Sequence, residues 1–301
     1  MRKDITKKFL GKENRYVGTI LSKGVVSFIY RKKINIDANQ ISYDVIEFGN
    51  VFSTSELTKL NKNNFLALKN IVEKKGKRVE FNMICCEGDK SHSDFLLGET
   101  EVTQELYELV MGYNPSYFEG KNSKQRPVER LTWYDAIMFC NKLSLLTNKR
   151  PYYEIKGIKY EDQTQTNIKE ASVETNEKAN GFRLPLEKEW EYAARASTNN
   201  QYVGTNDKSK LKEYAWFDKN SRKHTHSVKQ KKPNEWGLYD MSGNVLEWCY
   251  DLYDNNSNDR VIRGGGWQNF HMSLRSTFRS KYSPGDRGNA IGFRVAASLV
   301  N

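Results

Sequence analysis

Three capped amphipathic segments followed by a long loop-rich stretch are the feature that most constrains this 301-residue chain. Thr103 opens a segment that ends at Gly112, and Thr132 opens a second that runs over 133–146. A threonine side chain at the N-cap accepts a hydrogen bond from an amide that the first helical turn leaves unpaired. A proline begins the third helix, over 185–196. Beyond it, Gly and Asn separate short aromatic strands, so the order of elements predicts an α+β fold.

The N-terminal quarter of the chain differs from the rest and contains no motif with recognisable chemistry. Apolar residues over 16–29 favour a strand. Apolar spacing over 57–72, after a run of hydroxyl residues, predicts an amphipathic helix that ends at Gly76. We therefore expect an extension or small accessory module at 1–78 and one larger domain at 79–301.

Composition and charge exclude several classes of protein. Aromatic residues make up 12% and hydrophobic residues 38% of the chain, which is enough for a packed core. No apolar run approaches the roughly 18 residues of a membrane-spanning helix. The net charge of +11 could attract nucleic acid, but the basic residues are spread along the whole chain. Such spreading is typical of a solvated surface, and we expect no nucleic-acid partner.

A series of short motifs then follows in order, from about residue 80 to the end. They are ETEVTQELY (99–107), NPSYF (114–118), PVE (127–129), TWYDA (132–136), NKLS (141–144), FRLP (182–185), EWEYAAR (189–195), GLYDMSGNVLEW (237–248), RGGGW (263–267) and GFR (292–294). Together they resemble the formylglycine-generating-enzyme (sulfatase-modifying factor) family, which is built on a C-type-lectin-like fold. The resemblance implies an α+β, C-type-lectin-like domain with a small N-terminal extension.

The catalytic residues of that enzyme are missing from the matching positions. The family uses two copper-binding cysteines shortly after the RGGxW motif, but residues 250–301 contain no cysteine, and Asn269 stands at the first position. Asparagine cannot supply a thiolate ligand or nucleophile. The cysteines of the chain are Cys85, Cys86, Cys140 and Cys249. They include no C-x-x-C pair, and Cys140 and Cys249 have the aromatic neighbours of buried apolar residues. We expect no enzymatic activity and no required cofactor.

The C-terminal segment, residues 260–294, is similar to that of the variable proteins of bacterial diversity-generating retroelements, in the branch that shares the formylglycine-generating-enzyme frame. The frame residues are Arg263, Trp267, Arg275, Arg279, Pro284, Arg287, Gly292, Phe293 and Arg294. The resemblance implies that mutagenic reverse transcription diversifies the positions between them. These variable positions are Ile262, Gly266, Gln268, Asn269, Phe270, His271, Met272, Ser273, Thr277, Phe278, Ser280, Lys281, Tyr282, Ser283, Gly285, Asp286, Gly288, Asn289 and Ala290.

The size and content of this set favour a macromolecular ligand. It is close to the roughly 20–30 residues that one partner contributes to a standard protein interface. Aromatic, Met and His side chains among Ser, Asn and Gly are typical of a paratope. We expect the frame arginines to pair with carboxylates and carbonyls instead of forming a basic patch.

The leading hypothesis is a non-catalytic protein that binds a protein or other macromolecule through residues 262–290. Two alternatives stay open: a degenerate relative of the enzyme with an unconstrained loop, and an unusual or active oxidoreductase. A diversified surface is useful outside the cell, so the resemblance implies a cell-surface or extracellular protein, at the membrane only through a lipid anchor. The N-terminus lacks the apolar segment of a signal peptide, so a cytoplasmic location also stays open.

The resemblance also implies one calcium site. Its ligands would be Asp240, the carbonyls of Gly243 and Val245, and Glu247, a donor set that suits a hard cation. The alternative is a turn in which both carboxylates bond only backbone amides. A second calcium site of the family lacks its leading Asn, because Trp216 stands there.

The polar loop around Thr225 holds two of the four histidines, His224 and His226. No carboxylate lies within a few residues of them in the sequence. We therefore expect solvated side chains there, and no metal site.

Overall fold

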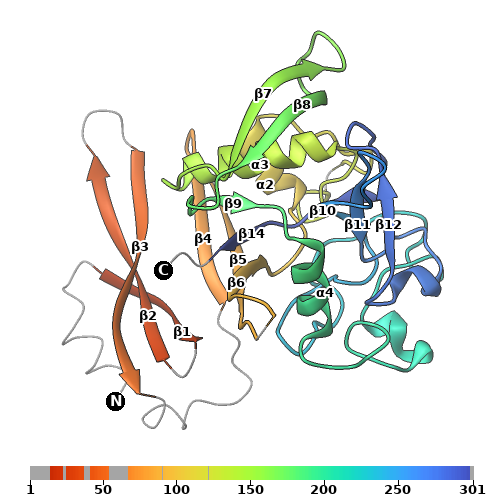
Figure 1. Cartoon of the computed structure of the whole chain (residues 1–301), viewed down its shortest axis with the longest axis horizontal. Coiled ribbons are helices and arrows are strands. Elements are labelled where there is room, and N and C mark those ends of the chain that lie inside the picture. Colours follow the sequence, from red (N-terminus) through yellow and green to blue (C-terminus); the bar gives the residue numbers. More distant parts are fainter. Residues whose placement is uncertain are drawn as a thin grey trace.

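The N-terminal part of the chain forms a separate antiparallel sheet. The structure, a computed structural model, describes residues 14–22, 25–36, 41–53, 67–89, 91–120 and 122–298, with side chains from residue 70 onward. The strands β1 (Asn14–Ser22), β2 (Val25–Ile36) and β3 (Ile41–Ser53) pair in that order (Figure 1). The strand expected over 16–29 is therefore present as β1 and the beginning of β2.

A five-stranded sheet opens the larger domain. Its order is β4 (Ala67–Lys74), β5 (Lys77–Cys86), β6 (Phe95–Gly98), β14 (Ala296–Ser298) and β9 (Phe182–Arg183). The C-terminal strand β14 lies between β6 and β9 and is antiparallel to both. The two ends of this domain therefore meet in one sheet.

The helix predicted over 57–72 is wrong where the structure describes it, because residues 67–72 belong to β4; the rest, up to residue 66, lies outside the described residues. Lys75 and Gly76 both have positive φ, 50° and 74°, which is the geometry of a two-residue hairpin turn. Gly76 thus turns the chain from β4 into β5 and does not end a helix. Since β4 belongs to the sheet, the domain begins near residue 70, earlier than the expected boundary at 79.

Two predicted helices are confirmed with their caps. They are α2 (Gln104–Met111) and α3 (Trp133–Leu146). Thr103 accepts a hydrogen bond from the Leu106 amide, and Gly112 ends α2 with φ 94°. Thr132 and Asp135 form a reciprocal capping box at α3.

The third helix, α4 (Glu187–Arg195), begins two residues later than predicted. Leu186 is its N-cap residue, and its amide donates to the Glu189 carboxylate. Pro185 therefore precedes the helix and is not part of its first turn. The positive φ of Ala196, 46°, ends it.

The remaining elements carry the C-terminal segment and its surroundings. They are the hairpin β7 (Tyr153–Tyr160) and β8 (Ile168–Thr175), the 3-10 helices η2 (Lys208–Glu213) and η3 (His271–Leu274), and the sheet β12 (Arg279–Tyr282), β11 (Arg260–Arg263), β10 (Leu246–Leu252) and β13 (Ile291–Gly292). Figure 1 shows β10, β11 and β12 on the right of the molecule, with the β7–β8 hairpin projecting from its top. Among the described residues, no helix has the length and apolar character needed to cross a bilayer.

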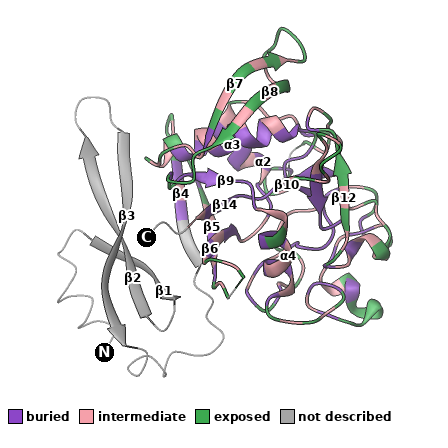
Figure 2. Ribbon diagram, in the orientation of Figure 1, coloured by how far each residue is buried: buried purple, intermediate pink, exposed green. Residues whose placement is uncertain are grey.

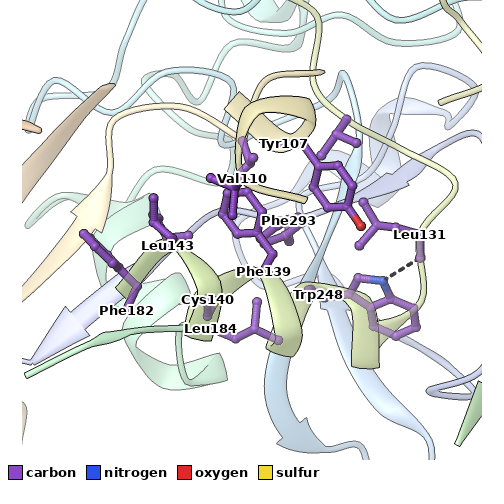
Figure 3. Close-up of a cluster of buried hydrophobic side chains, with 14 of the residues drawn as sticks. Tyr107, Val110, Leu131, Phe139, Cys140, Leu143, Phe182, Leu184, Trp248 and Phe293 are labelled. Carbon is purple, nitrogen blue, oxygen red and sulfur yellow. Dashed lines mark hydrogen bonds between the residues drawn. The ribbon is translucent and has the colours of Figure 1, made fainter. Parts of the chain in front are cut away.

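The core lies where α2 and α3 pack against both sheets. Tyr107 of α2 stacks on Phe139 of α3 at 5.4 Å between ring centroids, and Phe139 meets Phe293 edge to face at 5.2 Å (Figure 3). Cys140 and Cys249 are fully buried, as expected. Because Phe293 belongs to the C-terminal segment, the end of that segment is part of the core.

Candidate binding site on the C-terminal segment

A buried arginine fastens the middle of the C-terminal segment to α4. Arg263, at the end of β11, has 1% of its surface exposed. Its Nη2 donates to Glu191 Oε2 at 2.7 Å and to the Ser276 carbonyl at 2.8 Å. Its Nη1 donates to Glu187 Oε1 at 3.3 Å and to the Thr277 carbonyl at 3.2 Å. One guanidinium therefore pairs with two carboxylates of α4 and holds the backbone at 276–277 through two hydrogen bonds to its carbonyls.

Two other frame arginines, Arg279 and Arg287, pair in the expected way, whereas Arg275 forms no salt bridge with a described residue and its Nε is buried without a hydrogen-bond partner. Arg279 lies over the Tyr253 ring and makes two hydrogen bonds to the Glu187 carboxylate, at 2.7 and 2.9 Å. Arg287 pairs with Glu161, next to the end of β7, at 2.5 Å. These contacts hold the two sides of the segment to α4 and to the β7–β8 hairpin.

Most of the variable positions lie on the surface of this frame. Exposed are Gln268, Phe270, Met272, Thr277, Lys281, Tyr282, Ser283 and Asp286. Phe270 and Met272 have 69% and 58% of their surface exposed, which is high for large apolar side chains. Half-buried are Asn269, His271, Ser273, Phe278, Ser280, Gly285, Gly288 and Asn289. Figure 2 shows this exposure along the edge strand β12.

Three of the variable positions lie beneath the surface, so their side chains cannot contact a ligand in this conformation. Ile262 packs in the core, Ala290 is 2% exposed, and Gly266 is buried. Asn269 has a mainly local role, because its side chain accepts from the Gly266 amide at 2.8 Å and shapes the turn. Burial could not be read from spacing alone, since β11 places Ile262 on the inner face of its sheet.

A row of aromatic side chains beside Trp267 extends the exposed surface, and sequence reasoning missed it. The Trp267 ring meets Phe118 edge to face at 5.4 Å, and Phe118 meets the exposed Tyr117 at 5.1 Å. The aromatic pair in the NPSYF motif was the available signal. The motif lies far from the C-terminal segment in the sequence, so only the fold brings the two together.

The prediction that the two loop histidines are solvated was wrong. His224 and His226 are half-buried, with ring centroids 4.3 Å apart. His226 stacks on Trp216 at 3.7 Å, and burial lowers the pKa of His226. The loop is thus packed against the protein and is not freely solvated.

The residues expected to bind calcium lie in a buried group of charges. Both oxygens of Glu247 accept from Arg294, at 2.6 Å each, and neither residue has measurable exposure. Asp240 Oδ2 accepts from the Lys229 amide at 2.8 Å, whereas Asp240 Oδ1 is buried without a hydrogen-bond partner. Burial raises the pKa of Asp240 to about 6.

Glu101 adds a third carboxylate to this group, and both of its oxygens are buried without hydrogen bonds. Burial, and then the charges of Asp240 and Glu247, raise the pKa of Glu101 well above its ordinary value. Within the described ranges, no three His, Cys, Asp or Glu side chains gather as a metal site. Any cation here would therefore depend on backbone carbonyls as well.

The chemistry available to the cysteines is limited. Burial raises the pKa of Cys85 to about 12 and raises those of Cys86, Cys140 and Cys249 well above the ordinary value. All four thiols are therefore protonated at neutral pH, and none has the electropositive, accessible setting of a reactive cysteine.

Comparison with known proteins agrees with the fold. The model of the sulfatase-modifying factor enzyme 1-like domain matches residues 71–299. Chaperone protein LppX of Paenibacillus barcinonensis is 39% identical over 231 residues, which cover 68% of this chain and 81% of that protein. The inactive C-alpha-formylglycine-generating enzyme 2 of Mus musculus is 34% identical over 134 residues, covering 39% of this chain and 44% of that one. The structure of Treponema denticola variable protein 1 superposes with a TM-score of 0.64 and 36% identity, covering 76% of this chain and 98% of that one.

The free energy of unfolding of two variants tests whether the buried frame residues, and not the exposed side chains, stabilise the domain. We expect Arg263→Met to lower the free energy of unfolding by about 2–4 kcal/mol, because two carbonyls and two carboxylates lose their donor. Met272→Ala should change it by less than about 0.5 kcal/mol, since an exposed side chain contributes little to folding. Urea unfolding of both variants measures this, and a comparable loss in Met272→Ala would contradict the division.

Proposed function

We propose that this chain, which belongs to the sulfatase-modifying factor enzyme 1-like family, is a non-catalytic binding protein that presents its C-terminal segment to a macromolecular partner. The observation that carries the proposal is the exposure of Gln268, Phe270, Met272 and Tyr282 on a buried frame. Had these side chains filled a core, a degenerate relative of the enzyme would have been favoured. Frame contacts hold the backbone, so exposed side chains can vary without unfolding the domain.

Three further observations support a binding role over the oxidation of a cysteine. Residues 250–301 contain no cysteine, and the four thiols of the chain are kept protonated by burial. One relative is named an inactive form of the enzyme, and a similar structure is that of a variable protein. A relative named a chaperone protein is consistent with a protein as partner.

We propose that a retroelement diversifies the exposed variable positions. We also propose that this protein lies outside the cell and is held at the membrane only through a lipid anchor. The resemblance to variable proteins supports both statements. Fractionation of native cells, followed by immunodetection, tests the location, and a purely cytoplasmic pool would contradict it.

The flanking DNA provides the sharpest test of diversification. We expect a near-copy of the codons for 260–294 beside a reverse-transcriptase gene. The two copies should differ mainly at adenines, and mainly in codons for exposed positions such as Phe270 and Met272. Codons for the frame, such as those of Arg263 and Arg294, should match. Sequencing the locus decides, and substitutions spread evenly over frame and surface codons would contradict diversification.

The non-catalytic proposal and the catalytic alternative predict opposite results with a cysteine-containing peptide. Incubation of the purified protein with copper and a cysteine-containing sulfatase peptide should leave the cysteine unchanged, because no accessible thiolate is available. Mass spectrometry of the peptide measures this, with an active formylglycine-generating enzyme as the positive control. Formation of formylglycine would overturn the non-catalytic assignment.

We also propose a calcium ion bound by Asp240, the carbonyls of Gly243 and Val245, and Glu247. The buried, unpartnered Asp240 Oδ1 supports it, and the pairing of Glu247 with Arg294 weakens the contribution of Glu247. Calcium should raise the melting temperature of the wild type relative to a chelated sample and should have no effect on Asp240→Asn. Titration calorimetry without heat, together with an unchanged melting temperature, would remove the site.

A further inference from the structure

Two exposed apolar side chains mark the most prominent part of the proposed binding face. Phe270 is the N-cap residue of η3, and Met272 lies within it. The helix is anchored from below, because Leu274 packs in a small buried cluster with Leu211 of η2 and with Phe217. Leu274 therefore holds η3 in place, and Phe270 and Met272 point their apolar side chains toward solvent.

Basic residues of η2 and the following loop flank this helix. The Asp218 amide donates to the Asn269 carbonyl at 3.2 Å, which places residues 217–219 directly beside the start of η3. Desolvation lowers the pKa of His271, and the positive charges of Lys208, Lys219 and Arg275 lower it further, against an opposing effect of Asp218. Lys208 and Lys219 therefore lie near His271, the residue between Phe270 and Met272 in the sequence.

We define the basic rim as Lys208, Lys210, Lys212 and Lys219. The pairing with Lys232, and then the charges of Lys210 and Lys212, lower the pKa of Glu213, so two of the rim lysines lie near a carboxylate. All four side chains are exposed, and none forms a salt bridge with a described residue. Between 207 and 232 the chain has nine Lys or Arg and only three Asp or Glu. Two of those acidic residues are engaged, since Asp207 caps η2 and Glu213 pairs with Lys232 at 2.6 Å.

The opposite side of the C-terminal segment has a different charge pattern. On the β7–β8 hairpin, Lys159 pairs with Glu170 at 3.1 Å and Lys156 with Glu154 at 3.0 Å. On β12, Lys281 pairs with Asp259 at 2.9 Å. Lys156, Lys159 and Lys281 are thus paired on this side, although the exposed Lys169 forms no salt bridge with a described residue.

We propose that the partner is an acidic protein surface with an apolar socket: Phe270 and Met272 enter the socket, and the basic rim faces its carboxylates. This inference rests on the proposed binding function and names the class of partner. An apolar anchor beside a local cluster of exposed lysines favours a folded or peptide partner, which can combine an apolar socket with carboxylates.

A displayed library of random linear peptides, selected on the full chain, tests the proposal. We expect selected peptides to combine Asp or Glu with aromatic or aliphatic residues. The variant Phe270→Ser/Met272→Ser should lose their binding. The variant Lys208→Gln/Lys219→Gln should bind about tenfold more weakly at low salt, with a shallower dependence on salt. The control Lys75→Gln/Lys77→Gln, an equal charge change at the β4–β5 turn, should bind as the wild type does.

The outcomes separate this inference from the proposed function. Equal binding by the rim variant and its control would overturn the acidic partner while leaving the binding face intact. Peptides that bind equally well to the Phe270→Ser/Met272→Ser variant would count against the binding face itself. Phosphatidylserine vesicles or a single-stranded oligonucleotide bound as tightly as the selected peptides, through the same rim, would overturn a protein as the partner. Unchanged melting temperatures of all variants establish that they are folded.

Discussion

A single buried ion pair connects the parts of the domain that carry the C-terminal segment. Arg294 holds both oxygens of Glu247 at 2.6 Å and also donates to the carbonyls of Gly98 and Tyr239. Glu247 in turn accepts from the Trp190 indole at 2.6 Å. The pair thereby links the end of β6, the loop before β10, helix α4 and the end of the segment. Separating the two charges in this interior would be strongly destabilising. The pair therefore holds the five-stranded sheet, which contains β6, against the four-stranded sheet, which contains β10.

Backbone geometry fixes the path of the exposed stretch that this pair and Arg263 anchor. Gly264 and Gly265 have φ of 89° and 72°, a region in which other residues are strained. A Cβ atom on Gly265 would also lie 2.7 Å from the Ser273 carbonyl oxygen. The turn that begins the exposed stretch therefore depends on main-chain contacts and glycines, whereas its chemical character depends on side chains that contribute little to folding.

Local signals in the sequence were sufficient for the elements that they directly control. Thr103 and Thr132 fixed the starts of their helices because a cap depends only on residues within one turn. The apolar spacing over 57–72 fitted a helix, but pairing of β4 with β5 prevailed over that pattern in the described part. Strand pairing is set by a partner in the fold, so periodicity in one segment does not reveal it.

The same limit applied to the candidate site. The RGGxW frame and the polar, aromatic residues between its arginines identified the segment, and the buried arginines follow from their planar, multiply donating side chains. The burial of Ile262 and Ala290, the neighbour Phe118 and the basic rim on η2 all depend on contacts between distant parts of the chain. Apart from the aromatic pair of the NPSYF motif, none of these leaves a local pattern.

The position of β14 has a consequence for how this chain reaches its folded state. This strand follows the C-terminal segment in the chain, yet it lies inside the five-stranded sheet, between β6 and β9. The ribosome must therefore translate the whole segment before the sheet can close. A stop codon or frameshift within the segment removes β14, along with Phe293 and Arg294, so such a product lacks both a core aromatic and the buried ion pair. The sheet, the core and the buried ion pair can therefore form completely only in a chain whose C-terminal segment has been translated in frame to its end.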